Sequence, residues 1–238
     1  KSVCTNLPPV TIGVTTSDSR VYTYTWTRNG TVFPPNILGI DSSISIGTGG
    51  EYIVTATTTD GTNCSQSMTI QMKESSIATI TEKDITMVDL QTGPNNSITV
   101  STATLGIGDY EFALDDATGP YQDDPLFKNV RPGKHTIFVR DKNDCGIASV
   151  DTWVIGYKKF FTPNGDGYTD NWNVIGITST NQSKTKVYIF DRYGKLLKEL
   201  DPLSLGWDGN FNGNPMPQTD YWFKIILEDG RELKGNFS

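Results

Sequence analysis

The stretch "VYTYTWTRNG", residues 21–30, alternates large aromatic side chains with small ones. Tyr22, Tyr24 and Trp26 share one face, and Val21, Thr23 and Thr25 lie on the other. Because successive side chains of a β-strand point to opposite faces, this period of two predicts a strand with one buried face. The aromatic face needs a second sheet to cover it, so we expect Trp26 at the centre of a sandwich core.

The same period of two continues through most of the chain. It recurs in "GGEYIVTATTTDG" (49–61), and in "CSQSMTIQM" (64–72) it places Met68, Ile70 and Met72 on the expected core face. Gly, Pro, Asn and Asp interrupt the pattern at intervals of about 8–12 residues, which is typical of β-sandwiches. Almost no segment has the helical period, so the sequence predicts an all-β fold.

A weak internal repeat relates two parts of the chain. The segment "PGKHTIFVRDKNDC" (132–145) aligns with "GGEYIVTATTTDGTNC" (49–64), with a period of about 83 residues. The aligned pairs are Gly50 with Gly133, Tyr52 with His135, Val54 with Ile137, Asp60 roughly with Asp141, and Cys64 with Cys145. The repeat indicates an array of similar domains.

The repeat also offers an interpretation of His135, the single histidine of the chain. A histidine in a strand suggests a catalytic role, but His135 occupies the position of Tyr52 beside a glycine turn. In immunoglobulin-like sandwiches a tyrosine near this place ties the corner through a hydrogen bond. We therefore predict three immunoglobulin-like β-sandwich domains in a row, at residues 1–74, 75–157 and 158–238, and a structural role for His135.

Three cysteines are present, and none forms a Cys-x-x-Cys pair. With only one histidine, this composition argues against a zinc site. Cys4 precedes the first strand and Cys64 the last strand of the first domain, so we predict a Cys4–Cys64 disulfide. Such a bridge closes a loop of about 61 residues and stabilises the fold by roughly 4 kcal/mol in the chain-entropy estimate. It implies an oxidising, extracytoplasmic setting and leaves Cys145 without a partner.

The charge distribution excludes some classes of partner. The net charge is −7, and residues 75–157 hold six basic and twelve acidic side chains. Nucleic-acid binding requires clustered Lys and Arg, so we expect no such partner. No apolar stretch approaches the roughly 18 residues of a membrane span. We interpret Lys1 as the end left by cleavage or truncation, so we expect a fragment or a processed product.

Residues 158–238 have a different sequence pattern, which predicts two hairpins. "KTKVYIFDRYGKLLKEL" (184–200) turns at Asp191–Lys195, and "YWFKIILEDGRELKGNF" (221–237) turns at Asp229–Gly230. Residues 221–227 are mostly apolar on both faces, which predicts a central strand that is covered on both sides.

The stretch "FTPNGDGYTDNW" (161–172) has two alternative interpretations. Asn164, Asp166 and Asp170, with the carbonyl of Tyr168, have half the spacing of a Ca²⁺ loop. However, Thr162 stands where a first aspartate is often found, and no bidentate glutamate follows. The alternative is a turn in which the same side chains bond nearby backbone N–H groups. Ca²⁺ is therefore a candidate cofactor.

Three segments carry a resemblance to a known family. They are "FTPNGDGYTDNW", "VYIFDRYGKLLKEL" and "GWDGNFNGNPMPQTDYWFKIILEDGRELKG", and they resemble the gliding-motility-associated C-terminal domain, the type B sorting domain of the Bacteroidetes type IX secretion system. The resemblance implies an immunoglobulin-like sandwich that directs its passenger through the type IX translocon with a PorP/SprF-family outer-membrane partner. The sorting-motif positions it implies are Phe161, Thr162, Pro163, Asn164, Gly165, Asp166, Gly167, Asp170, Gly206, Trp207, Asp208 and Gly209. The upstream domains look like repeats of SprB-type surface adhesins.

Other residues that suggest chemistry also have structural interpretations. Asp115–Asp116 and Asp123–Asp124 form two acidic pairs, which suggest a glycosidase, a Ca²⁺ site or a solvated loop. Five tryptophans suggest either a sugar-binding platform or core packing. No nucleophile–base pair, phosphate loop or dinucleotide motif is present, so we predict no enzymatic activity.

Together these observations predict the C-terminal region of a secreted gliding or adhesion protein at the cell surface. Its mechanism is recognition, and a surface polysaccharide is a candidate ligand. The alternative is a set of accessory modules with a sorting domain on a secreted polysaccharide-degrading enzyme.

Overall fold

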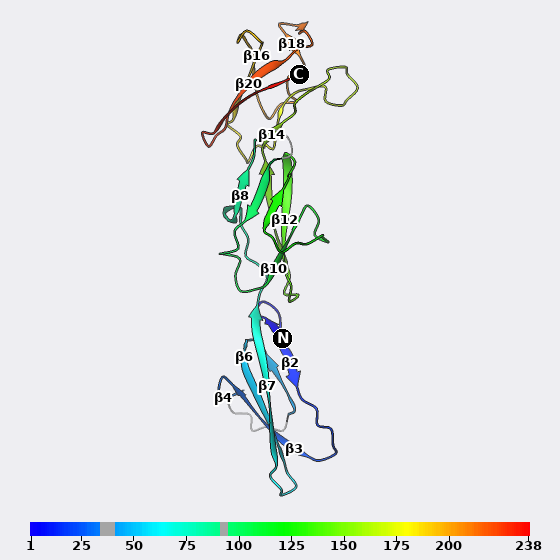
Figure 1. The fold of residues 1–238 in the computed structure, drawn as a ribbon, viewed down its shortest axis with the longest axis vertical. Coiled ribbons are helices and arrows are strands. Elements are labelled where there is room, and N and C mark those ends of the chain that lie inside the picture. The colour runs from blue at the N-terminus through cyan, green and yellow to red at the C-terminus, as the bar shows by residue number, and fades with distance from the viewer. Residues whose placement is uncertain (34–40, 91–94) are drawn as a thin grey trace. The chain divides into compact units, whose positions relative to one another are not determined.

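The structure, a computed structural model, describes residues 1–33, 41–90 and 95–238 (Figure 1). Within these ranges the regular elements are β-strands and one short 3₁₀ helix, η1 (Glu82–Asp84), which confirms the all-β class. The chain divides into two compact units. Unit 1 comprises Lys1–Ile80, Thr102–Asp123 and Phe138–Ser149, and unit 2 comprises Thr81–Ser101, Asp124–Ile137 and Val150–Ser238. The division into three domains stays a prediction.

The N-terminal sandwich consists of strands β1 to β7. Their bounds are β1 (Ser2–Cys4), β2 (Val10–Gly13), β3 (Tyr22–Arg28), β4 (Thr31–Val32), β5 (Ser43–Ile46), β6 (Gly50–Thr58) and β7 (Ser65–Ser75). One sheet has the order β1-β7-β6-β3-β4, and the other pairs β2 with β5. All pairings are antiparallel except β1 with β7, which is parallel.

The core of this sandwich follows the sequence pattern on β3. Trp26 is 4% exposed and Tyr24 9% exposed, whereas Val21 on the opposite face is 71% exposed. Ile12 and Ile46, from β2 and β5, belong to the same buried cluster, so two sheets enclose the aromatic face. The expectation for β7 is only partly correct, because Met72 is buried but Met68 is 58% exposed.

The middle strands form two three-stranded sheets. One sheet has the order β11-β9-β8 and the other β10-β12-β13. The bounds are β8 (Ile85–Val88), β9 (Ser97–Val100), β10 (Tyr110–Leu114), β11 (Leu126–Lys128), β12 (Gly133–Asp141) and β13 (Ile147–Val154).

The geometry of β6 and β12 supports the internal repeat. Both strands begin at a glycine with a positive φ, +138° at Gly50 and +137° at Gly133. The Tyr52 hydroxyl donates to the carbonyl of the residue four positions earlier at 2.8 Å, and His135 Nε2 lies 2.7 Å from the equivalent carbonyl of Arg131. The two side chains therefore make the same corner contact, which supports a structural role for His135.

The alignment of Asp60 with Asp141 needs a shift. β6 and β12 have the same length, so Thr58 and Asp141 occupy equivalent final positions. The Thr58 hydroxyl accepts a hydrogen bond from the Cys64 N–H at 3.1 Å, and Asp141 Oδ2 accepts one from the Cys145 N–H at 3.4 Å. The turn between β6 and Cys64 is longer than the turn between β12 and Cys145. An alignment anchored on the two cysteines therefore matches Asp141 with Asp60 instead of Thr58.

The C-terminal sandwich consists of strands β14 to β21. Their bounds are β14 (Gly156–Tyr157), β15 (Val174–Ile175), β16 (Lys186–Phe190), β17 (Leu196–Leu200), β18 (Asn210–Phe211), β19 (Asn214–Pro215), β20 (Tyr221–Ile226) and β21 (Glu232–Phe237). The main sheet has the order β17-β16-β20-β21, with β14–β15 and β18–β19 as separate pairs. Both expected hairpins are present, with Gly194 and Gly230 at positive φ in their turns.

Strand β20 is central, as the sequence predicts, but its second face is only partly covered. Tyr221, Phe223 and Ile225 are buried, whereas Trp222 on the opposite face is 42% exposed. The Tyr221 hydroxyl donates to the Pro217 carbonyl, four residues earlier, so this sandwich has the corner contact of the other two.

The predicted Cys4–Cys64 disulfide is wrong, because Cys4 is bonded to Cys145. Strand β1 pairs in parallel with the end of β7, and Cys4 lies opposite Ser75. Cys64 precedes the start of β7, which is 11 residues long. At about 3.3 Å per residue, the strand separates the two cysteines by roughly 35 Å. The hairpin turn before β13 instead brings Cys145 to Cys4.

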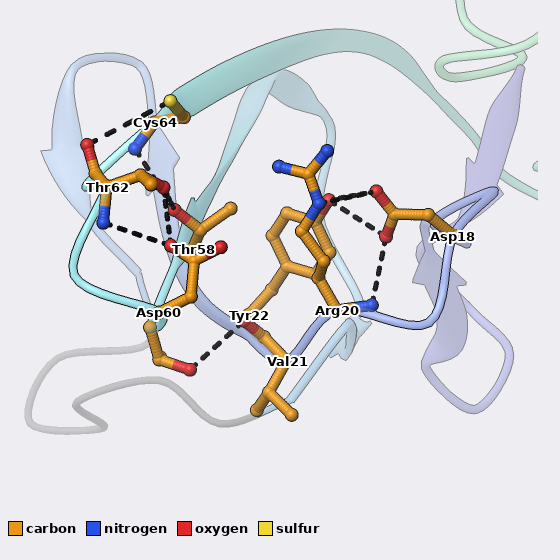
Figure 2. Close-up of polar contacts among 9 residues, drawn as sticks. Asp18, Arg20, Val21, Tyr22, Thr58, Asp60, Thr62 and Cys64 are labelled. Carbon is orange, nitrogen blue, oxygen red and sulfur yellow. Dashed lines mark hydrogen bonds and ion pairs between the residues drawn. The ribbon is translucent and has the colours of Figure 1, made fainter.

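Cys64 is a free and exposed thiol at the opposite end of β7 (Figure 2). Its Sγ lies 3.9 Å from the Thr62 carbonyl oxygen. In the same turn the Asp60 carboxylate accepts hydrogen bonds from the Thr62 hydroxyl and from the Thr62 N–H, the second at 3.0 Å. These two bonds, the hydroxyl first, hold the pKa of Asp60 below the ordinary aspartate value. The turn is thus closed by its own side chains.

Candidate functional site

The loop Phe161–Trp172 is held in shape by side chains that bond its own backbone. Asp170 Oδ1 accepts the N–H of Gly165 at 2.7 Å, and Oδ2 accepts the N–H of Gly167 at 2.8 Å. Both glycines have positive φ, +77° and +86°, which allows their N–H groups to converge on one carboxylate. A single aspartate therefore closes the tip of the loop.

Asn164 and Asp166 form a second set of bonds in the same loop. Asp166 Oδ1 accepts the Tyr168 N–H at 2.8 Å, and its Oδ2 accepts the Asn164 side-chain amide at 2.8 Å. Asn164 Oδ1 in turn accepts the Asp166 N–H at 3.1 Å. The Tyr168 N–H, followed by the Asn164 amide, lowers the pKa of Asp166. The carboxylate is thus stabilised in its charged form.

These contacts bear on the two interpretations of the loop. The side-chain oxygens expected to bind Ca²⁺ already accept hydrogen bonds from backbone or amide N–H groups, and the Tyr168 carbonyl accepts one from the Thr162 hydroxyl at 3.4 Å. Across residues 1–33, 41–90 and 95–238, no group of three or more His, Cys, Asp or Glu side chains is placed to hold a metal ion. The loop therefore contains the hydrogen bonds that the turn interpretation requires, and Ca²⁺ binding by these residues stays a prediction.

The second motif segment, Gly206–Gly209, is closed in a similar way. The Asp208 carboxylate accepts the side-chain amide of Asn210 at 2.8 Å and the backbone N–H of Asn210 at 3.0 Å. The side-chain amide of Asn210 contributes most to a lowered pKa of Asp208. Trp207 Nε1 donates to the Asn210 carbonyl at 2.8 Å, which fixes the indole inside the sandwich.

A backbone bridge joins the two motif segments. The Trp172 N–H donates to the Trp207 carbonyl at 2.9 Å, and the Trp207 N–H donates back to the Trp172 carbonyl at 2.8 Å. Gly206 makes this approach possible, because a Cβ at this position would lie 2.6 Å from the Trp172 carbonyl oxygen. We call the two segments Phe161–Trp172 and Gly206–Gly209 the paired loops.

A cluster of aromatic side chains packs under the paired loops, on the side that faces the core of the sandwich. The Trp172 ring stacks on Phe237, with centroids 3.9 Å apart and an interplanar angle of 11°. The Phe161 ring lies 5.6 Å from Trp207 and 5.8 Å from Phe237. The Phe161 N–H also donates to the Ser238 carbonyl at 2.9 Å. The last strand, β21, is therefore part of the base that positions both loops.

The outer side of the paired loops is open to solvent. Residues 163–168 are exposed, and the Tyr168 side chain is 79% exposed. Gly209 lies against the base, since a Cβ there would sit 3.4 Å from both Phe161 and Pro163. The arrangement is a rigid surface with a buried aromatic base, which is suited to binding.

Residues 155–237 match the sequence model of the CHU_C Type IX secretion signal domain. The end of this chain is similar to a type IX secretion signal domain. The match includes both paired loops and strands β14 to β21. A match to this signal domain implies export by the type IX machinery to the cell surface or the extracellular space. Within the described residues, no helix combines the length and apolar character needed to cross a bilayer.

Similar solved structures include immunoglobulin domains 1–5 of Sidekick-1, at 11% identity and a TM-score of 0.40 over 100% of this chain and 56% of that chain. The eight N-terminal immunoglobulin domains of the Down Syndrome Cell Adhesion Molecule match at 12% identity and a TM-score of 0.40. That match covers 100% of this chain and 35% of the other, so the chain spans about half and about a third of these two structures. The titin I-band fragment I67–I69 matches at 13% identity and a TM-score of 0.33, covering 100% of this chain and 93% of that one. No curated protein sequence matches the chain.

The acidic pairs in the middle of the chain lie in turns. Asp116 Oδ1 accepts the Thr118 N–H at 2.8 Å, Asp124 Oδ1 accepts the Leu126 N–H at 2.9 Å, and Asp123 pairs with Lys142 at 2.6 Å. These contacts support the solvated-loop interpretation.

The tryptophans divide between core and surface. Trp26, Trp172 and Trp207 are buried and unavailable for sugar stacking. Trp153 is partly buried, with Lys134 Nζ 6.0 Å from its ring centroid, and Trp222 is the most exposed of the five.

Two buried polar contacts were not predicted from the sequence. Asp141 is fully buried and accepts hydrogen bonds from Ser75 Oγ at 2.7 Å and the Asn143 N–H at 3.0 Å. Asp89, whose side chain is 2% exposed, forms an ion pair with Arg231. Both contacts join residues far apart in the sequence, so no local pattern signals them.

Proposed function

We propose that the paired loops are the surface by which residues 158–238 are recognised during type IX secretion, with a PorP/SprF-family outer-membrane protein as the direct partner. The observation that supports this proposal is the Trp172–Trp207 backbone bridge. It joins the two motif segments into one surface, although 34 residues of sequence lie between Trp172 and Trp207. A partner that reads both segments together would recognise the folded domain and reject an unfolded chain.

Rigidity is the physical advantage of such a surface. Binding by a mobile loop loses free energy because the loop must become ordered, whereas a preformed loop avoids that loss. The carboxylates of Asp166, Asp170 and Asp208 are engaged by neighbouring N–H groups, so the turns are set before any partner arrives. Recognition then depends on the shape of the loops and on the exposed Tyr168.

A secretion assay tests the proposal. Residues 155–238 are fused to a fluorescent passenger in a type IX-competent bacterium, with any natural C-terminal extension restored. We expect export of the parent fusion and a loss of at least about tenfold with Tyr168→Ala combined with Asp208→Ala, the equivalent of about 1.4 kcal/mol of binding. Lys184→Ala, at a side chain that is 81% exposed outside the paired loops, is the matched control.

Folding of each variant is checked by thermal melting, so that loss of recognition is separated from loss of structure. If the folded double variant is exported as well as the Lys184→Ala control, the paired loops are not the recognition surface. If the parent fusion stays inside the cell, the sorting assignment itself is wrong.

We further propose that residues 1–157 form the stalk of a gliding or adhesion protein. This protein binds a surface polysaccharide or another surface at a distance from the cell. The repeated β-sandwich plan and the secretion signal support this proposal. Deleting residues 1–157 from the exported protein should abolish adhesion or gliding while secretion continues. Unchanged adhesion would refute the stalk proposal.

Ca²⁺ binding by Asn164, Asp166, Tyr168 and Asp170 remains a separate hypothesis. Occupancy requires these oxygens to exchange their N–H partners for the cation. Thermal melting in Ca²⁺ and in chelator tests this, because a bound ion raises the melting temperature. Equal midpoints in both conditions, with the same result for Asp166→Ala, would eliminate the hypothesis.

A further inference from the structure

The Cys4–Cys145 bridge changes the covalent path between the two ends of the chain. The bonded residues are 141 positions apart in sequence. Starting from Lys1, the shortest covalent route runs through residues 1–4, crosses the bridge, and continues from 145 to 238. Residues 5–144 form a closed covalent loop beside this route.

Strand order shows what lies in that loop. Strands β2 to β12 fall entirely within residues 5–144. They include β3 and β6, which carry Trp26 and Tyr52 in the core of the N-terminal sandwich. On the direct route lie the three-residue strand β1 and strands β13 to β21, including the secretion signal domain.

We propose that this bridge is a mechanical shunt: tension applied between the two ends passes through the disulfide, and the backbone of strands β2 to β12 lies outside the loaded covalent route. These strands feel the load through hydrogen bonds, as where β7 pairs with β1 and β12 with β13. Tension along a chain follows the taut covalent route, and a closed loop beside that route stays slack. The N-terminal sandwich therefore keeps its fold at forces that unfold the C-terminal sandwich. This inference uses only the covalent connection and does not rest on the proposed sorting or adhesion functions.

The surroundings of the bridge fit a permanent connection. Cys145 is 2% exposed, which shields its sulfur from reductants. The Asn6 side-chain amide donates to the Cys145 carbonyl at 2.8 Å, and Ser2 Oγ donates to Asn143 Oδ1 at 2.7 Å. Residues on both sides of Cys4 are therefore held to the turn that carries Cys145.

The test is single-molecule pulling of the full chain, with handles at Lys1 and Ser238. In the oxidised protein, only residues 1–4 and 145–238 should contribute to the stretched length. Reduction, or the double substitution Cys4→Ser with Cys145→Ser, should add roughly 470–510 Å of extension, at 3.3–3.6 Å per residue over the bridged separation. Cys64→Ser is the matched control and should leave the oxidised length unchanged, because this cysteine is free.

Three results would overturn the shunt. The first is an equal stretched length before and after reduction. The second is a gain of roughly 200–220 Å, which indicates a Cys4–Cys64 bridge, or of roughly 270–290 Å, which indicates a Cys64–Cys145 bridge. These measurements on the unsubstituted chain do not depend on whether the double variant folds.

The third result concerns the fold of the loop. If strands β2 to β12 are still folded when reductant is added at constant force, the extra length appears as unfolding steps after the bond breaks. Release of the whole length in one jump at the moment of reduction would show that these strands were already unfolded, and would refute protection by the bridge.

Discussion

At Gly206 the backbone of one paired loop touches the backbone of the other. This glycine has φ of +114°, and a Cβ would lie 2.6 Å from the Trp172 carbonyl oxygen. We expect Gly206→Ala to destabilise the C-terminal sandwich by about 2–3 kcal/mol, because it adds a backbone clash to an unfavourable φ. Urea denaturation measures the change in the free energy of unfolding.

Gly213→Ala is the matched control for this prediction. Gly213 also has a positive φ, +78°, but no atom lies within 4 Å of an added Cβ. We expect only the cost of the left-handed backbone, about 1 kcal/mol. Equal losses for the two variants would show that the contact with Trp172 contributes nothing.

Asp141 is a second residue whose role depends on distant partners. Its buried carboxylate accepts hydrogen bonds from Ser75, Asp109 and Asn143. We expect Asp141→Asn to cost about 2–4 kcal/mol, because the amide nitrogen cannot accept the bonds made by one of the two oxygens. Thermal melting should show the loss, while Asp144→Asn in the same turn should change stability by about 0.5 kcal/mol or less. A similar small change for both variants would argue against a central role for Asp141.

At the scale of elements, the paired loops should be sensitive to acid. Hydrogen bonds from neighbouring N–H groups hold the pKa of Asp166 and of Asp208 below the ordinary aspartate value of 3.8. A lowered folded-state pKa means that the stabilisation is present above pH 3.8 and is lost as the pH falls through the folded-state value. We expect the melting temperature to fall below about pH 4.

The contribution of these loops is separated from that of other carboxylates by comparing variants. Asp166→Asn with Asp208→Asn should reduce the drop in melting temperature between pH 6 and pH 3. If the wild-type chain and the double variant show the same drop, the two carboxylates do not contribute to acid sensitivity.

The elements also show which parts of the fold the local pattern determines. The alternation in residues 21–30 predicted the buried face of β3, and the turn glycines predicted both hairpins of the C-terminal sandwich. The alternation misplaced Met68, and the apolar character of both faces misplaced Trp222, because a local pattern shows which side chains are apolar but not how far the opposite sheet extends. Sheet coverage depends on strands that are distant in the sequence.

At the scale of the whole molecule, the bridge should contribute to thermodynamic stability. A closed loop with a separation of 141 residues lowers the entropy of the unfolded chain by an amount worth about 5 kcal/mol, which is an upper value in this estimate. We expect the double substitution Cys4→Ser with Cys145→Ser to lower stability by several kcal/mol in urea denaturation. Cys64→Ser should change it by about 0.5 kcal/mol or less. Comparable effects of both substitutions would contradict the assigned pairing.

The sequence by itself determined the all-β class, the corner residues Tyr52 and His135, and the motifs that identify the secretion signal, because each depends on neighbouring residues or on a short repeat. It also allowed two interpretations of the loop at 161–172. Tertiary structure alone decided that Cys4 pairs with Cys145, that Asp141 is buried among distant donors, and that Trp172 and Trp207 join the paired loops. These contacts depend on which strands become neighbours in space, and periodicity along the chain carries no information about that choice.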